Sequence, residues 1–226
     1  MESINMDWVI IIITLVISLG SSAYIKYQYN KTNKIKNNKN ITGYEVARKI
    51  LDANGLSNVK ILEVSGELSD HYNPSNKTVN LSSDIYRKSS IAAISVASHE
   101  CGHAIQDKNG YVFLKFRNSI VPIVNLASKL GYVAILIGLF TSLVKLLWVG
   151  IFFEFIILFF QLLTLPVEFN ASDRALSQIY KLGIVDKKER SKCKGMLTAA
   201  ALTYVAGVAS AILQIIRLML MANRRR

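Results

Sequence analysis

Cysteine is scarce in this chain, with only Cys101 and Cys193 among 226 residues. Two widely separated cysteines form neither a disulfide framework nor a Cys-x-x-Cys metal knuckle. A reducing compartment is therefore allowed, although it is not required. Histidine is scarce too, since the chain has three. Any metal site must therefore use very few imidazoles.

Acidic residues are also few, with 15 Asp and Glu against 27 Lys and Arg, and the net charge is +12. Despite that charge, 51% of the residues are hydrophobic and the mean hydropathy is +0.31. Charged and apolar residues must be segregated into blocks, which excludes both a disordered chain and an ordinary soluble globule. The basic residues crowd beside apolar runs without interleaved aromatics, so we expect cationic flanks of membrane segments and no nucleic-acid partner.

The first apolar run, Trp8–Ile25, contains no charged residue and as a helix would be about 27 Å long, enough to cross a bilayer. A cleaved signal peptide is disfavoured because Glu2 and Asp7 precede the run where positive charge is expected. Five lysines without an intervening acid follow the run: Lys26, Lys31, Lys34, Lys36 and Lys39. The positive-inside rule therefore predicts an outer amino terminus and a cytoplasmic segment after residue 25.

Three further apolar runs follow later in the chain. Leu130–Val144 and Leu146–Val167 are separated by little more than Lys145 and predict a tight helical hairpin, whose first helix could begin as early as Ile120. The last run, Met196–Met221, is rich in small residues that suit close helix contact, and it is long enough to span. Basic residues flank it at both ends, so the charge rule leaves open whether this run crosses fully.

The polar segment between the first two runs predicts a small α/β unit. Thr42 and Glu45 form a capping-box pattern that opens a helix. Two short β-prone segments follow, Val59–Val64 and Lys77–Leu81, with a turn-forming Asn-Pro-Ser-Asn sequence before the second. The segment Ser89–Asp107 then shows the apolar spacing of a helix.

Residues 99–103 read His-Glu-Cys-Gly-His, an H-E-x-x-H motif on that last helix. The spacing places His99 and His103 on one face, where both imidazoles can bind one metal ion. Glu100 can then act as general base on a metal-bound water, and zinc supplies the Lewis acid that this chemistry needs. We therefore expect one zinc ion per chain, with a coincidental helix bearing core histidines as the alternative. Cys101 projects away from the two histidines on an ideal helix, which favours a core filler over a ligand.

A catalytic zinc site needs a third protein ligand beside a free fourth position. The one other histidine, His71, lies upstream in a turn-like Asp-His-Tyr-Asn-Pro segment. Glu168 follows Pro166, which suits the first turn of a new helix that ends at Gly183. A helix dipole favours an ionised carboxylate there, so Glu168 is a candidate ligand, with a solvated Glu at a helix start as the alternative.

Three segments resemble the YugP-like neutral zinc metallopeptidases of bacteria: Asp70–Ser82, Ser95–Gln106 and Pro166–Leu176. The order of the four apolar runs fits as well, and the resemblance covers nearly the whole chain. These membrane proteins are distantly similar to the membrane-embedded gluzincin proteases related to the heat-shock protease HtpX and the CAAX-prenyl protease.

The resemblance implies a zinc site of four residues, with His99, His103 and Glu168 as ligands and Glu100 as base. The related proteases usually show an E-x-x-x-D pattern, whose aspartate supports a ligand histidine. Here Asp173 lies five residues after Glu168 instead of four. Asp173 and Asn170 are therefore equal candidates for that supporting role.

Several other features have two interpretations each. His71 and Tyr72 could donate hydrogen bonds to the oxyanion of a tetrahedral intermediate, or His71 could be a structural turn residue. Lys77–Leu81 could be an edge strand that pairs with a substrate backbone, or an ordinary member of the sheet. Glu154, within the third apolar run, is a functional candidate by its position, or a neutral residue that faces a neighbouring helix.

These patterns predict a mainly α integral membrane protein with about four transmembrane helices and a small α/β zincin-like domain that carries the H-E-x-x-H helix. We expect five segments: a transmembrane anchor at 1–25, a cytoplasmic α/β region at 26–118, a transmembrane hairpin at 119–167, a cytoplasmic helix with the third zinc ligand at 168–195, and a membrane helix with a basic tail at 196–226.

The expected activity is zinc-dependent hydrolysis of peptide bonds in membrane-associated proteins or peptides, at the cytoplasmic face of the bacterial inner membrane. The alternative is a zinc-binding membrane scaffold or adaptor without turnover. Glu100 argues against that alternative, because a structural zinc site does not need a carboxylate between its ligands. A third interpretation, a channel or transporter in which the motif occurs by chance, is supported only by Glu154 and the small residues of the last run.

Overall fold

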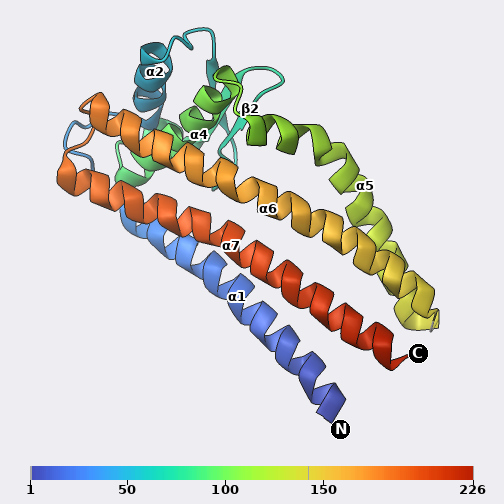
Figure 1. The fold of residues 1–226 in the computed structure, drawn as a ribbon. Coiled ribbons are helices and arrows are strands. Elements are labelled where there is room, and N and C mark those ends of the chain that lie inside the picture. Colours follow the sequence, from blue (N-terminus) through green and yellow to red (C-terminus); the bar gives the residue numbers. More distant parts are fainter. Residues whose placement is uncertain (1, 142, 226) are drawn as a thin grey trace. The chain divides into compact units, whose positions relative to one another are not determined.

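The structure is a computed structural model of the chain and describes residues 2–141 and 143–225. Seven helices and three strands follow one another in these residues (Figure 1): α1 (Glu2–Asn33), α2 (Gly43–Ala53), β1 (Lys60–Val64), β2 (His71–Asn73), β3 (Thr78–Ser82), α3 (Ser83–Arg87), α4 (Ile91–Lys108), α5 (Val112–Thr141), α6 (Val144–Lys181) and α7 (Lys187–Arg224). This content confirms the predicted mainly α fold with a small α/β portion.

The chain divides into two compact units, each of which is described by itself. The first unit consists of Met1–Ala23, Phe116–Leu165 and Leu202–Arg226. The second consists of Tyr24–Lys115 and Pro166–Ala201. The elements described in the first unit are all helices, and the second unit contains the sheet with α2, α3 and α4.

Four helices contain stretches long and apolar enough to cross a membrane, as the four apolar runs predict: Met6–Asn33, Val112–Thr141, Val144–Lys181 and Lys187–Arg224. Many of their large apolar side chains are exposed, and the exposed fraction of Phe140 reaches 87%. Helices with saturated backbone hydrogen bonds and apolar outer surfaces are the form that a bilayer tolerates. The chain is therefore a membrane protein with four candidate spans.

Small residues let the helices of the first unit approach one another closely. A Cβ atom on Gly131 of α5 would lie 2.8 Å from the Cβ of Phe153 on α6, and one on Gly150 of α6 would lie 2.4 Å from Cγ1 of Ile135 on α5. Both distances are shorter than non-bonded carbons allow. Close glycine contacts of this kind are typical of packed membrane helices, and they fix the α5–α6 hairpin.

The sheet of the second unit has the strand order β1-β3-β2, in which β3 pairs parallel with β1 and antiparallel with β2. The segment Lys77–Leu81 therefore corresponds to the central strand and is an ordinary sheet member, so the edge-strand interpretation is wrong. His71–Asn73, expected as a turn, forms the edge strand β2 instead. The turn lies just after it, where Lys77 has a φ of 53° and closes the β2–β3 hairpin.

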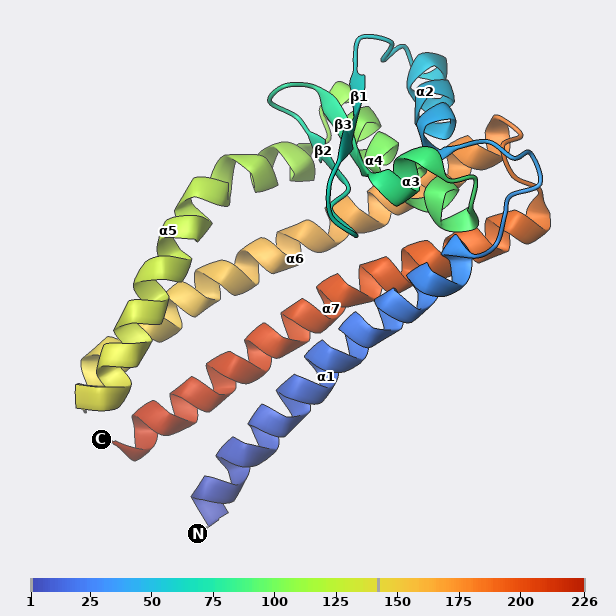
Figure 2. The ribbon, with the colours of Figure 1, turned by 180° about the vertical axis from the view of Figure 1, so that it is seen from behind.

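Helices α2 and α4 pack against each other beside the sheet, as Figure 2 shows from behind. The capping box predicted for α2 is confirmed: Thr42 Oγ1 accepts from the Glu45 N–H at 3.2 Å, and Glu45 Oε2 accepts from the Thr42 N–H at 2.7 Å. The apolar core between these elements is fully buried and includes Val46, Ile50, Leu81, Ile94 and Ala97.

Helix α6 corrects one expectation, because it runs from Val144 to Lys181 without a break at Pro166. Proline removes one backbone hydrogen bond and its ring crowds the carbonyl four residues earlier, so it disfavours a helix interior. The helix nevertheless continues through Pro166, as α5 continues through Pro122, because packing on both sides of the proline offsets this cost. Glu168 therefore lies inside a helix and not in a first turn, and the helix-dipole argument for its charge does not apply. Helix α5 likewise begins at Val112, well before the expected start.

Candidate metal centre

Helix α4 carries three of the four residues predicted for the site: His99, Glu100 and His103. Ser90 caps its first turn, with the side-chain oxygen accepting from the Ala93 N–H at 3.0 Å. Most residues of α4 are buried on all sides between α2, the sheet and α6. The motif is therefore held in the interior of the second unit.

Helix α6 brings Glu168 to the two histidines. At the crossing of α4 and α6, a Cβ atom on Gly102 would lie 2.4 Å from the Ala171 carbonyl oxygen, so only glycine permits this approach. Glu168 Oε2 lies 3.2 Å from His99 Nε2 and 3.5 Å from His103 Nε2. The structure thus brings the two motif histidines and the candidate third ligand together.

This donor set fits a zinc ion. One ligand atom from each of His99, His103 and Glu168 lies within 4.8 Å of the others. Ligands about 2 Å from a tetrahedral zinc ion lie about 3.3 Å from one another, which is close to the two distances from Glu168. His103 and Glu168 are buried and His99 is nearly so. Two imidazole nitrogens and one carboxylate oxygen are also the ligand types of catalytic zinc sites.

A hydrogen-bonded glutamine sets the orientation of His103. Gln106 Nε2 donates to the Val167 carbonyl at 2.8 Å and to Asn170 Oδ1 at 3.0 Å, which turns Gln106 Oε1 toward His103 Nδ1 at 3.0 Å. Since an amide oxygen can only accept, the proton of a neutral His103 is on Nδ1. The lone pair of Nε2 is then free on the side of Glu168, as a metal ligand requires.

The Nδ1 atom of His99 also has a hydrogen-bond partner. His99 Nδ1 lies 3.2 Å from Ser172 Oγ, on the helix that carries Glu168. A partner at Nδ1 leaves Nε2 of His99 to face the carboxylate. Both imidazoles are thus held with the same nitrogen toward Glu168.

The charges around the site favour a cation. Burial alone would lower the pKa of His103, but the hydrogen bond to Glu168 and the charges of Glu100 and Glu168 outweigh it, so the pKa of His103 is raised. Carboxylates that stabilise a proton on this imidazole also stabilise a divalent cation bound in its place. The electrostatics therefore agree with the donor geometry.

Glu100 is buried, and within the described residues its carboxylate has no hydrogen bond or ion pair. Its charge nonetheless acts on His103, and on Asp70 at the start of β2. Burial and the charge of Glu100 raise the pKa of Asp70 even though Ser82 N–H donates to it at 2.7 Å. A carboxylate without a protein partner is available to a water molecule or to a substrate amine.

The other candidates from the upstream segment lie apart from the donor cluster. His71 is exposed, and its Nδ1 lies 2.9 Å from the Ser69 carbonyl. Tyr72 donates its hydroxyl to Asp107 Oδ2 at 2.6 Å, and burial together with that carboxylate raises the pKa of Tyr72. Lys77 pairs with the same Asp107 oxygen at 2.5 Å. Tyr72 is therefore a protonated hydroxyl held by Asp107.

The two candidates for the supporting role on α6 have different surroundings. Asn170 Oδ1 accepts from Gln106 and, at 2.7 Å, from Arg174 Nε, so Asn170 belongs to the network behind His103. Asp173 is exposed and lines a separate pocket, and in the described part of the chain its carboxylate has no hydrogen bond to a motif histidine. Ser172, one residue earlier, makes the contact with His99.

The remaining sequence candidates do not join the cluster. Cys101 is fully buried with its thiol 3.6 Å from the Ala47 carbonyl, and burial raises its pKa, as is typical of an inert core thiol. Cys193 is also buried. Glu154 belongs to the other compact unit.

Two contacts of this site were not predicted from the sequence, that of Gln106 with His103 and that of Ser172 with His99. Gln106 lies three residues after His103, so helical spacing places it beside that histidine. Ser172 lies four residues after Glu168 and is found by the same rule once α6 is known to continue through this segment. Spacing was therefore the available signal for both residues.

Comparison with known proteins agrees with the site. A family model described as "Putative neutral zinc metallopeptidase" matches residues 7–223. The chain is 41% identical over 215 residues to the "Putative membrane protease YugP" of Bacillus subtilis (strain 168). The aligned region covers 95% of this chain and 96% of that protein. No solved structure gives a significant match. The chain thus belongs to the family described as "Putative neutral zinc metallopeptidase".

Proposed function

We propose that the protein is a membrane-embedded zinc peptidase that hydrolyses peptide bonds in membrane-associated proteins or peptides. The observation that carries the proposal is that one ligand atom from each of His99, His103 and Glu168 lies within 4.8 Å of the others. Glu100, next to His99 in sequence, is buried and its carboxylate has no partner among the described residues. Three protein ligands and an adjacent free carboxylate are the composition of a catalytic zinc site.

In the proposed mechanism, His99, His103 and Glu168 hold the metal, and Glu100 moves the proton. Zinc bound there supplies a Lewis acid that lowers the pKa of water to about 7 and polarises a carbonyl group. The Glu100 carboxylate takes a proton from the attacking water and delivers it to the nitrogen of the leaving amine. Gln106 and Ser172 keep the imidazoles oriented throughout.

The sequence around the site supports the proposed substrate class and location. Helix α4, which carries the motif, ends at Lys108, and the candidate span of α5 begins at Val112. A substrate held beside or within the membrane is therefore within easy reach. The lysines that follow the first apolar run favour a cytoplasmic site at the cell membrane.

The test is a peptidase assay on the purified full-length protein with casein or a quenched fluorescent peptide. We expect wild type to hold about one zinc per chain and to cleave, and a chelator to abolish cleavage until zinc is restored. Glu100→Gln should keep its zinc and lose activity by roughly a hundredfold or more, the scale of general acid–base catalysis.

A matched control is Glu67→Gln, which removes the same charge from an exposed position of the same unit. It should cleave at the wild-type rate. Zinc-loaded wild type that cleaves neither substrate would favour a metal-binding scaffold, and a Glu100→Gln enzyme as fast as wild type would refute the proposed role of this residue.

A further inference from the structure

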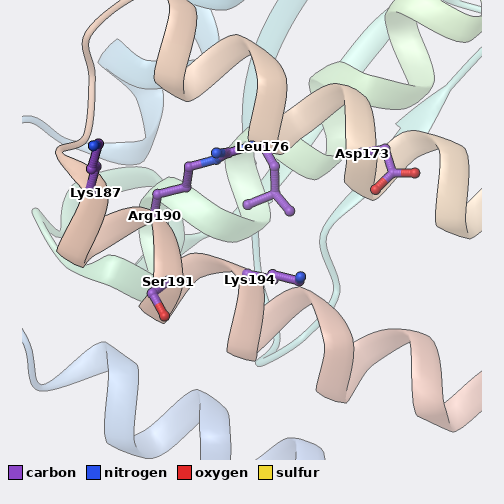
Figure 3. A pocket seen from close by; sticks show the side chains of 6 residues that line it. All are labelled: Asp173, Leu176, Lys187, Arg190, Ser191 and Lys194. Carbon is purple, nitrogen blue, oxygen red and sulfur yellow. The ribbon is translucent and has the colours of Figure 1, made fainter.

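A second candidate site lies in the same compact unit, between the carboxyl-terminal part of α6 and the first turns of α7. The pocket has a volume of about 340 Å³, at the lower end of the range of roughly 300–1,000 Å³ for small-molecule sites. Figure 3 shows the residues that line it: Asp173, Leu176, Lys187, Arg190, Ser191 and Lys194.

The basic residues of the pocket come from a single face of one helix. Lys187, Arg190, Ser191 and Lys194 follow the three-and-four spacing that aligns side chains along a helix. Leu176 of α6 provides an apolar wall opposite them, and the Arg190 side chain extends toward it in Figure 3. Three cations and a hydroxyl group therefore line one small concave surface.

These cations are not neutralised within the described residues. No ion pair involves Lys187, Arg190 or Lys194, and the one carboxylate of the lining, Asp173, has no ion pair either. The Arg190 guanidinium instead stacks 4.9 Å from the centroid of the Tyr180 ring, which holds it in place. The lining has three positive charges and one negative charge.

The acidic residues of the same segment serve a different role. Asp186 and Glu189 cap the start of α7, where Asp186 Oδ1 accepts from the Glu189 N–H at 2.8 Å. Both also accept hydrogen bonds from Asn38 in the loop that follows α1. Asn38 Nδ2 donates to Asp186 Oδ2 at 2.9 Å, and the Asn38 backbone N–H donates to Glu189 Oε1 at 2.7 Å. These hydrogen bonds direct both carboxylates toward the Asn38 loop and the start of α7, and within the described residues neither carboxylate forms an ion pair with a pocket cation.

We propose that this pocket binds a phosphate group, carried by the headgroup of an anionic phospholipid or present as free phosphate. Arg and Lys donors with a hydroxyl suit tetrahedral phosphate oxygens, and Leu176 suits the apolar stem of a lipid. Both helices that form the pocket contain candidate membrane spans, and basic pockets on such helices attract anionic headgroups. The proposal is independent of peptidase activity.

The test uses full-length protein in a neutral detergent. Phosphatidylglycerol and phosphatidylcholine with the same acyl chains are titrated, and bound lipid is counted by native mass spectrometry, while inorganic phosphate binding is measured by equilibrium dialysis. We expect phosphatidylglycerol to bind roughly tenfold more tightly than phosphatidylcholine. The triple variant Lys187→Gln, Arg190→Gln, Lys194→Gln should lose that preference.

The matched control is the triple variant Lys181→Gln, Lys188→Gln, Lys192→Gln, which removes the same charge from the same segment outside the pocket lining. It should bind phosphatidylglycerol within about twofold of wild type. If inorganic phosphate binds with the same dependence on the pocket cations while the two lipids bind equally, the ligand is free phosphate.

A second variant keeps the test decisive if the pocket triple variant fails to fold. Ser191→Glu adds one carboxylate at an exposed position of the pocket, and Ser65→Glu adds one at an exposed position elsewhere in the unit. Only the first should weaken binding. The proposal is overturned by equal losses in pocket and control variants, or by the absence of any lipid preference together with absent phosphate binding.

Discussion

At the scale of single residues, the candidate zinc site depends on how its two imidazoles are turned. The oxygen of Gln106 lies 3.0 Å from His103 Nδ1, and the amide nitrogen of Gln106 is held by α6. A partner at the second nitrogen of a ligand histidine fixes the tautomer and increases the basicity of the ligating nitrogen. We therefore propose that Gln106 acts on a metal at this site through His103.

We predict that Gln106→Ala weakens zinc binding by roughly tenfold or more, since removal of such partners typically lowers metal affinity on that scale. Competition with a chromogenic zinc chelator measures the effect. Gln178→Ala is the control, because Gln178 is also partly buried and hydrogen-bonded, to Asn54, but contacts no residue of the site. Equal weakening in both variants would show that a general loss of stability is responsible.

The proximity of His99 and His103 could be predicted from the sequence because their relation is local, four residues apart on one helix. Spacing also places Gln106 beside His103, but the direction in which its side-chain amide points could not be predicted, since it depends on the Val167 carbonyl on a different helix. The resemblance, not the residue pattern alone, singled out Glu168. Residue spacing by itself left Glu168 and His71 open as third ligands.

At the scale of secondary-structure elements, the site depends on the close crossing of α4 and α6. Gly102 allows that crossing, because any Cβ atom there would lie 2.4 Å from the Ala171 carbonyl oxygen. The crossing also places Glu168, three residues before Ala171, beside the histidines of α4. Gly102 within the motif is therefore a structural requirement of the candidate metal centre.

We predict that Gly102→Ala forces the two helices apart, destabilises the protein by roughly 1–3 kcal/mol and weakens zinc binding as Glu168 withdraws. Gly195→Ala is the control, since no atom lies within 4 Å of a Cβ built there and alanine favours a helix by about 1 kcal/mol. Thermal unfolding in detergent and zinc content report the two effects. A Gly102→Ala protein with wild-type stability and zinc would contradict the close crossing.

The elements themselves were predictable where local signals agreed with packing. The capping box at Thr42 and the apolar spacing of 89–107 correctly located α2 and α4. Pro166 misled the prediction, because its preference for a first turn was overridden by the continuity of α6. The strand β2 has only three residues, too few for a β pattern to stand out beside a proline turn.

At the scale of the whole molecule, the candidate site constrains the topology. The α4 motif and Glu168 must reach one ion, so an even number of membrane crossings must separate them, and the apolar runs of α5 and α6 supply two. The lysines after the first run predict that this shared side is the cytoplasm. Run length predicted the four candidate spans, but basic residues at both ends of the last run left its crossing undetermined by charge.

We predict that single cysteines introduced by Lys34→Cys and Lys188→Cys, both at exposed positions, react with a membrane-impermeant reagent only after the membrane is opened. Ser3→Cys should react in intact cells. The parent is a variant without the buried Cys101 and Cys193. Reaction of positions 34 and 188 from opposite sides of the membrane would contradict a single cytoplasmic site.

The central claim is that His99, His103 and Glu168 together hold one zinc ion. The most direct test is the zinc content and affinity of Glu168→Ala beside His71→Ala, measured on purified protein by elemental mass spectrometry and chelator competition. Removal of Glu168 should weaken zinc binding by roughly tenfold or more. Removal of His71, which is exposed and outside the cluster, should leave zinc content at the wild-type value. Zinc lost on removal of His71 and retained on removal of Glu168 would contradict the account and point to a site of three histidines.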